Sequence, residues 1–209
     1  MRVVPAFART VVAAAAVAWL MQPGSAAAEP PRIPTADAAR GLLDGLAVAD
    51  EGSLSGYSRD AFPHWNTSGE CTTRETVLQR DGNDVTVDSK CRPTAGRWHS
   101  PYDEQTATDP SDIDIDHVVP LAEAWRSGAS EWTVDQRERF ANDLDSPQLI
   151  AVTASSNRSK GDQDPSQWLP PNAGYRCTYT QMWVAVKSQW NLALQPAEKD
   201  ALAQVLQNC

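Results

Sequence analysis

The sequence has few of the residues that mark a zinc–cysteine protein, a membrane protein or a strongly basic nucleic-acid-binding protein. Its 209 residues include four cysteines and three histidines. The cysteines have neither tight C-x-x-C spacing nor neighbouring histidines, which excludes a zinc–cysteine site. Basic residues are outnumbered 18 to 27 by acidic ones, giving a net charge of −9. This charge does not attract a polyanion, so a nucleic-acid substrate would require a metal ion and a local basic patch.

The N-terminal residues have the order of charge and hydrophobicity that is typical of a secretory signal peptide. Residues 1–10 contain Arg2 and Arg9 and no acid, and residues 11–21 are apolar, "VVAAAAVAWLM". This run is shorter than the ~20 residues of a membrane span. "PGSAAAEP" then offers a cleavage site after Ala28. We therefore expect a secreted, extracellular protein of residues 29–209, with no membrane segment in its mature form.

Cleavage of the predicted signal peptide would remove Arg2 and Arg9 and no acidic residue. The mature protein would then have 16 basic and 27 acidic residues, and its formal charge would be −11 instead of −9.

The cysteines are even in number, which in an exported chain predicts two disulfides. Three pairings are possible, and nearness in sequence favours Cys71–Cys91 and Cys177–Cys209.

The mature chain is long enough for one domain with a proper core. Capping residues and apolar spacing predict helices, at residues 35–48, 72–82, 120–128, 134–144, 155–161, around 179–190 and from 196. Alternating or short apolar runs predict strands, at residues 84–91, 112–117 and 149–152. Residues 92–111 are rich in turn formers. Together these patterns predict an α+β single domain that is mostly helical.

The segment "DIDIDHVVPLAEAW", residues 112–125, places aspartates at every second position before a histidine. In a strand, Asp112, Asp114 and Asp116 share one face. Like charges at this spacing repel unless water or a cation lies among them. One interpretation is a solvated edge strand with acids that prevent aggregation.

Two metal sites are the other interpretations. The acids fit positions 1, 3 and 5 of a calcium-binding EF-hand loop, with Glu123 at position 12, but His117 stands where that loop requires glycine. In the second, Asp116 binds a divalent ion and His117 transfers protons. The downstream segment "LIAVTASSNRSKGD" supports the second interpretation. Its Asn157 and Lys160 share a helix face, and they offer an oxygen ligand and a charge for a phosphate.

Together, "DIDHVVP" and "LIAVTASSNRSKGD" resemble the HNH endonucleases, the ββα-metal or His-Me finger group. Their pattern is D-H-(I/V)-x-P at a strand end, then a second strand and a helix with N-R-x-K. "GYSRDAFPHW", "WHSPYD" and "FANDL" extend the resemblance to secreted bacterial members similar to the GmrSD C-terminal domain. The resemblance implies a nuclease domain at 29–209 with a ββα core at about 110–165 and a helical insertion at 121–147.

The resemblance also implies metal-dependent hydrolysis of phosphodiester bonds, with Mg²⁺ or Mn²⁺ and with DNA favoured over RNA. His117 would be the general base, and Asp116 and Asn157 the metal ligands. Asp114 would hold water on the ion or orient His117. Lys160, and also Arg158, would contact the substrate phosphate. Protein partners are not identified.

The central asparagine that steadies the histidine in many members aligns best with Gln148, which leaves the positioning of His117 open. Two alternatives to an active nuclease remain. One is a secreted calcium-binding module without catalysis, and the other is a degenerate HNH domain that binds nucleic acid without cutting it.

Overall fold

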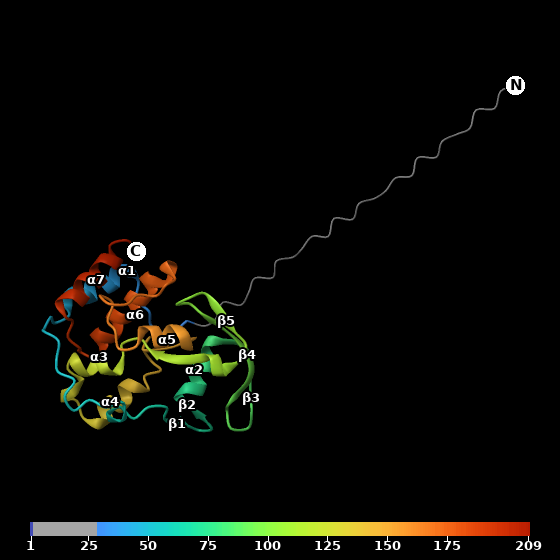
Figure 1. Cartoon of the computed structure of the whole chain (residues 1–209), viewed down its shortest axis with the longest axis horizontal. Helices are drawn as coiled ribbons and strands as arrows, with labels where there is room; N and C mark the ends of the chain where they lie inside the picture. The colour runs from blue at the N-terminus through green and yellow to red at the C-terminus, as the bar shows by residue number, and fades with distance from the viewer. Residues whose placement is uncertain (2–28) are drawn as a thin grey trace.

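The computed structural model describes residue 1 and residues 29–209 (Figure 1). The predicted signal peptide therefore lies outside the described residues, except for Met1. None of the described helices is long and apolar enough to cross a membrane. Residues 29–209 form helices α1 Ala36–Gly45, α2 Thr73–Asp81, α3 Leu121–Arg126, α4 Val134–Ala141, α5 Ala154–Lys160, α6 Arg176–Gln189 and α7 Pro196–Leu206.

The strands form three small antiparallel sheets. These are β1 Thr67–Ser68 with β2 Cys71–Thr72, then β3 Gly82–Val87, β4 Pro93–Ser100 and β5 Gln105–Ala107, and finally β6 Ile113–His117 with β7 Leu149–Thr153. The α+β prediction is confirmed by this mixture of helices and small sheets.

The β6–β7 sheet separates two hydrophobic cores. Ile113, Ile115, Leu149 and Ala151 pack with residues of α2 and with Trp98 of β4. Ile150 and Val152 belong to the larger core, which is built mainly from the helices. Because β7 is buried on both faces, its sequence is a continuous apolar run without alternation.

Helices from the two ends of the described chain lie side by side. α1 packs against α6 and α7, and Figure 1 shows the blue and red helices together. Both predicted disulfides are present, Cys71–Cys91 and Cys177–Cys209. The first joins β2 to the loop between β3 and β4, and the second joins α6 to the C-terminal residue.

Three expectations about local structure are wrong. Helix α1 ends at Gly45 and not near Val48, because Leu46 is extended and Val48 pairs with Leu194. The turn-rich segment 92–111 contains β4 and β5, whose side chains are mostly exposed and can therefore be polar. Asp112 lies in a 3-10 turn, Pro110–Asp112, and not in the strand.

Candidate functional site

Helix α5 lies against the acidic side of β6 and supplies one polar partner to each aspartate of the strand. Asn157 Nδ2 donates to Asp114 Oδ2 at 3.2 Å, and Lys160 Nζ donates to Asp116 Oδ1 at 2.8 Å. Residues two apart on a strand and three apart on a helix are separated by similar lengths, about 7 Å and about 5 Å. The spacing of Asn157 and Lys160 on one helix face therefore matches the spacing of the aspartates.

Asp116 and Lys160 form a buried ion pair. The Lys160 side chain is fully buried and that of Asp116 is 4% exposed. Tyr102 Oη donates to the other Asp116 oxygen at 2.8 Å, and Lys160 Nζ also donates to the His117 carbonyl at 2.9 Å. Burial raises the pKa of Asp116, and the Lys160 ammonium opposes this shift. In this position Lys160 does not reach solvent, so its placement does not support the predicted contact with a substrate phosphate.

His117, at the end of β6, is held by one backbone carbonyl. Its Nε2 lies 2.9 Å from the carbonyl oxygen of Ala141. Ala141 is the last residue of α4, where carbonyl groups have no partner within the helix. A carbonyl can only accept, so Nε2 carries the proton. Burial lowers the pKa of His117 from 6.5 to about 3, so the ring is neutral and Nδ1 keeps its lone pair.

The Trp65 indole stacks on the His117 ring, with centroids 5.5 Å apart and an interplanar angle of 28°. Trp65 has a φ of 62°, a left-handed conformation that is unfavourable for a bulky residue. Asn142 holds this segment on both sides of the indole: it accepts from the Asn66 N–H and donates to the Pro63 carbonyl, both at 2.9 Å. Asn142, the residue after Ala141, therefore holds Trp65 in place, and Trp65 is the second residue that contacts the His117 ring.

The Gln148 side chain forms no hydrogen bond with His117. It is fully buried and bonds both backbone groups of Val119, accepting from N–H at 3.1 Å and donating to C=O at 2.9 Å. The alignment of Gln148 with a histidine-orienting residue therefore does not correspond to a hydrogen bond in the structure. The Ala141 carbonyl occupies that role geometrically, through a backbone group that side-chain patterns do not reveal.

A pocket of about 140 Å³ brings several predicted site residues together. His117, Asp116 and Asn157 line it, and so do Arg59 and Asp162. Asp114 lies beside Asn157, as described above. Arg158 is exposed on α5 and does not line this pocket, and Asp112 is exposed outside the strand.

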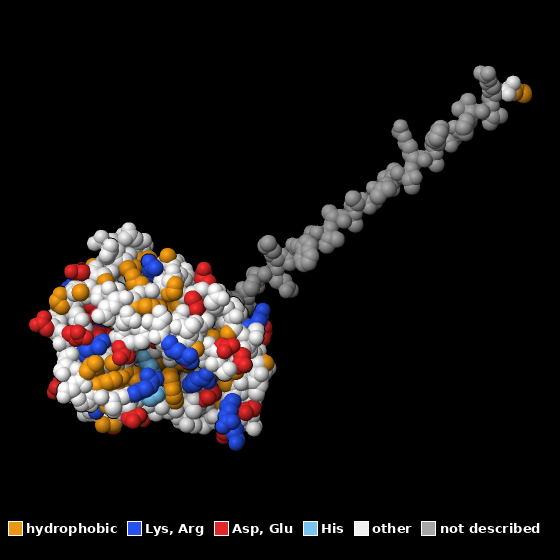
Figure 2. Space-filling model, viewed as in Figure 1, with side chains coloured by type: hydrophobic (Ala, Val, Ile, Leu, Met, Phe, Trp, Pro, Cys, Tyr) orange, Lys and Arg blue, Asp and Glu red, His pale blue; other side chains and the backbone are white. Residues whose placement is uncertain are grey.

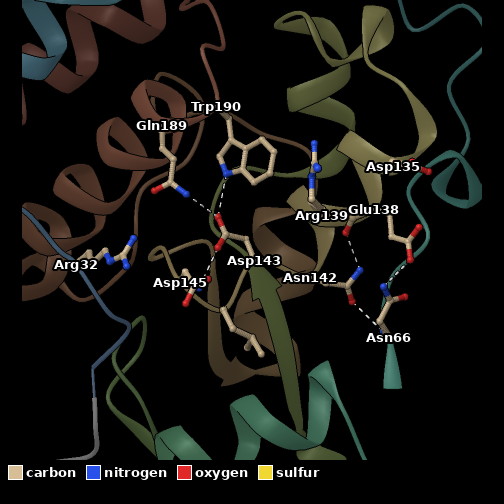
Figure 3. A pocket seen from close by; sticks show the side chains of 11 residues that line it. Arg32, Asn66, Asp135, Glu138, Arg139, Asn142, Asp143, Asp145, Gln189 and Trp190 are labelled. Carbon is tan, nitrogen blue, oxygen red and sulfur yellow. Dashed lines mark hydrogen bonds between the residues drawn. The ribbon is translucent and has the colours of Figure 1, made fainter. Parts of the chain in front are cut away.

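A second and larger pocket, of about 830 Å³, lies beside residues 142–145 (Figure 3). Asp143 accepts there from the side chains of Gln189 and Trp190, at 3.1 and 2.9 Å. Four acidic residues and two arginines line the pocket, an excess of negative charge that disfavours a polyanion. The pocket is larger than the His117 pocket, but several of its polar side chains form hydrogen bonds with other residues that line it.

The donor set for a metal ion is small. Residues 1 and 29–209 contain no group of three or more His, Cys, Asp or Glu side chains arranged to hold a metal. The predicted set has two carboxylates, Asp114 and Asp116, and the amide of Asn157, which are hard oxygen donors of the kind Mg²⁺ prefers. Each Asp116 oxygen accepts one hydrogen bond and retains further lone pairs. Since Mg²⁺ keeps several waters, these few oxygens fit the ion.

Sequence reasoning missed several residues around His117. Trp65 was not singled out as a contact of the site, and Ala141 contributes only its carbonyl. Arg59 and Trp65 lie in "GYSRDAFPHW", Tyr102 in "WHSPYD" and Ala141 in "FANDL". Those three segments carried the wider resemblance to the family, and this resemblance was the signal in the sequence that could have pointed to these residues.

Comparison with known proteins identifies a family for this chain, and it is the family that the sequence motifs resemble. The family model described as "GmrSD restriction endonucleases, C-terminal domain" matches residues 73–205. A protein of Arthroderma benhamiae named "Uncharacterized secreted protein" is 58% identical over 181 residues, which cover 86% of this chain and 89% of that protein. The restriction to bacteria in the sequence-based resemblance is not confirmed. No solved structure matches. The chain belongs to the family of GmrSD restriction endonuclease C-terminal domains.

Proposed function

We propose that this protein is a secreted HNH-type endonuclease that hydrolyses phosphodiester bonds with His117 as general base and one divalent ion, Mg²⁺ or Mn²⁺. The observation that carries the proposal is the geometry of His117. Its Nε2 proton is held by the Ala141 carbonyl, its Nδ1 makes no hydrogen bond with the described residues, and its side chain lines the same pocket as Asp116 and Asn157. The family name and the name of the relative from Arthroderma benhamiae support nuclease activity and secretion.

A base that takes a proton from water needs a lone pair and a fixed direction. The Ala141 carbonyl provides the direction by fixing the tautomer, and Trp65 restricts rotation of the ring. Water in the pocket can then pass its proton to Nδ1 while its oxygen attacks phosphorus. The bond from phosphorus to the leaving oxygen breaks, and that oxygen takes a proton from solvent.

Asp116, Asn157 and Asp114 are the residues that would hold the divalent ion. When bound, such an ion neutralises charge on the phosphate and on the leaving oxygen. Asp116 and Asn157 line the same pocket as His117, and Asp114 is joined to Asn157 by a hydrogen bond. The β6–β7–α5 order, with β6 antiparallel to β7, supports assignment of this part to a ββα-metal finger.

Lys160 has a positioning role in this proposal. It binds Asp116 and the carbonyl of His117 at once, so it fixes the proposed ligand and the base relative to each other. This replaces the phosphate contact expected from the resemblance.

An EF-hand type of calcium module has less support. Residues 113–117 form a strand paired with β7 along its whole length, not a loop that wraps an ion. Glu123, the expected last ligand, is fully buried against Lys187. Asp114 and Asp116 are therefore better explained by their hydrogen bonds to Asn157 and Lys160 of α5 than by a calcium-binding loop.

The proposal is tested with the oxidised protein of residues 29–209 and supercoiled plasmid DNA, with Mg²⁺, Mn²⁺, Ca²⁺ or EDTA. We expect nicking with Mg²⁺ or Mn²⁺ and none with EDTA. A parallel incubation with RNA tests the preference for DNA. A folded protein that cuts neither nucleic acid with any ion, yet binds one of them, would contradict catalysis and favour the degenerate HNH alternative.

A further inference from the structure

Arg59 lies in the same pocket as His117 and Asn157 but has no role in the function described above. It belongs to a 3-10 turn, Arg59–Ala61, at the start of the segment that continues to Trp65. Arg59 is the only lysine or arginine among the described residues that line this pocket. Because Lys160 is bound to Asp116 and buried, Arg59 supplies the accessible positive charge.

The hydrogen bonds of His64 fix the direction of Arg59. Arg59 Nε lies 3.3 Å from His64 Nε2, and His64 Nδ1 lies 2.8 Å from the Phe62 carbonyl. A guanidinium only donates and a carbonyl only accepts, so His64 Nε2 must accept and Nδ1 must carry the proton. This tautomer is neutral, and it leaves the Arg59 Nη1 and Nη2 groups without a hydrogen-bond partner among the described residues.

The backbone that carries Arg59 and His64 is fixed to the body of the protein. Arg137 Nε donates to the Ala61 carbonyl at 2.8 Å, and Phe62 is fully buried. The His64 ring lies 6.4 Å from the His117 ring, between centroids. Figure 2 shows histidine side chains near the middle of this face with Lys and Arg side chains beside them, although the protein as a whole is acidic.

We infer that Arg59, positioned by His64, binds a non-bridging oxygen of the scissile phosphodiester in a nucleic acid. This inference rests on the proposed nuclease function. A planar guanidinium with two free terminal nitrogens matches the geometry of a phosphate. Its charge offsets the negative charge that grows on the phosphate during attack, which is the local positive charge that an acidic nuclease requires. Arg59 is a catalytic residue in this assignment, and His64 is a positioning residue.

The experiment compares Arg59→Ala and Arg59→Lys with Arg92→Ala, which removes an exposed arginine from the loop between β3 and β4. We expect Arg59→Ala to lower kcat/KM for DNA cleavage on the order of 100-fold. Arg59→Lys should retain part of the activity, because lysine keeps the charge without the fork. Arg92→Ala should cut like the wild type. Circular dichroism and thermal unfolding show whether each variant is folded.

His64 is tested by a pair of variants. His64→Phe removes the acceptor for Arg59 Nε, whereas His64→Gln supplies an amide oxygen in its place. We expect His64→Phe to lose about tenfold in kcat/KM and His64→Gln to recover most of it. Inhibition by inorganic phosphate should weaken in Arg59→Ala and His64→Phe and remain unchanged in Arg92→Ala, a readout that a general loss of stability does not produce.

The outcomes separate the two proposals. If the wild type cuts DNA and Arg59→Ala cuts equally well, the role of Arg59 is refuted and the proposed function stands. If the wild type does not cut any nucleic acid, both proposals fail. Loss of cleavage in Arg59→Ala with unchanged phosphate inhibition would also refute the phosphate contact.

Discussion

Replacement of Lys160 by methionine tests whether this lysine is a buried partner of Asp116 or a contact for substrate. Methionine retains most of the side-chain volume but removes the ammonium. The change leaves Asp116, which is 4% exposed, with only the hydrogen bond from Tyr102. It also removes the donor to the His117 carbonyl.

The expected loss follows from this burial. Removing one partner of a buried ion pair typically costs about 3–5 kcal/mol, because the remaining charge has no compensation. We therefore expect Lys160→Met to lower the free energy of unfolding by about 3–5 kcal/mol at pH 7. Without the ammonium, burial raises the pKa of Asp116 further above its unfolded value. The folded state then binds an extra proton, so the deficit should grow as the pH rises.

Urea unfolding of the protein of residues 29–209, followed by the fluorescence of its seven tryptophans, measures this loss. The double variant Asp116→Asn/Lys160→Met should be more stable than Lys160→Met, because asparagine carries no charge and still accepts from Tyr102. Arg158→Met is the matched control, since Arg158 is exposed on the same helix and should cost no more than about 0.5 kcal/mol. A cost for Lys160→Met below about 1 kcal/mol, similar to that of the control, would refute the buried pair.

Three other predictions concern separate parts of the chain. Because burial lowers the pKa of His117 to about 3, kcat/KM should stay nearly level from pH 7 to pH 5, and an acid limb centred near pH 6.5 would contradict this. The free energy of unfolding should also fall as the pH drops below 6.5, since the unfolded state then binds the extra proton. Gln148→Met should lower the free energy of unfolding by about 2–5 kcal/mol, because it leaves both backbone groups of Val119 without partners. The folded Gln148→Met variant should still cut DNA. A loss of cleavage in the folded variant would restore a catalytic role for Gln148. Replacing Cys177 and Cys209 by serine should lower the free energy of unfolding by about 3–4 kcal/mol, as expected for the 32-residue separation; an unchanged urea midpoint would show that this disulfide does not stabilise the fold.

Local signals in the sequence predicted much of the fold. The capping box of Thr133 and Gln136 and the Thr35 cap are present in the structure. Both disulfide pairs follow from nearness in sequence. The strands at 93–107 were missed because they lie at the surface, where polar residues satisfy both a strand and a turn. Only Trp98 and Ser100 of β4 are buried, too few to give a pattern.

The candidate site shows a similar division. The motif spacing predicted that Asp114, Asp116 and Asn157 would lie together, and α5 does meet β6 at these residues. The sequence did not predict that Lys160 would be buried, because it is buried together with Asp116, which Tyr102 also binds, and only the fold brings Tyr102 to this place. The carbonyl that holds His117 could not be found from side-chain patterns, since every residue has a carbonyl and only the fold selects Ala141.

The most direct test of the central claim is single-turnover cleavage of DNA by His117→Ala beside His99→Ala. His99 is an exposed histidine on β4 and does not line the His117 pocket. Loss of a general base should slow cleavage about 10²–10⁴-fold in folded His117→Ala, whereas His99→Ala should cut at the wild-type rate. Equal cleavage rates in wild type and His117→Ala, with Mg²⁺ or Mn²⁺ present, would contradict the account.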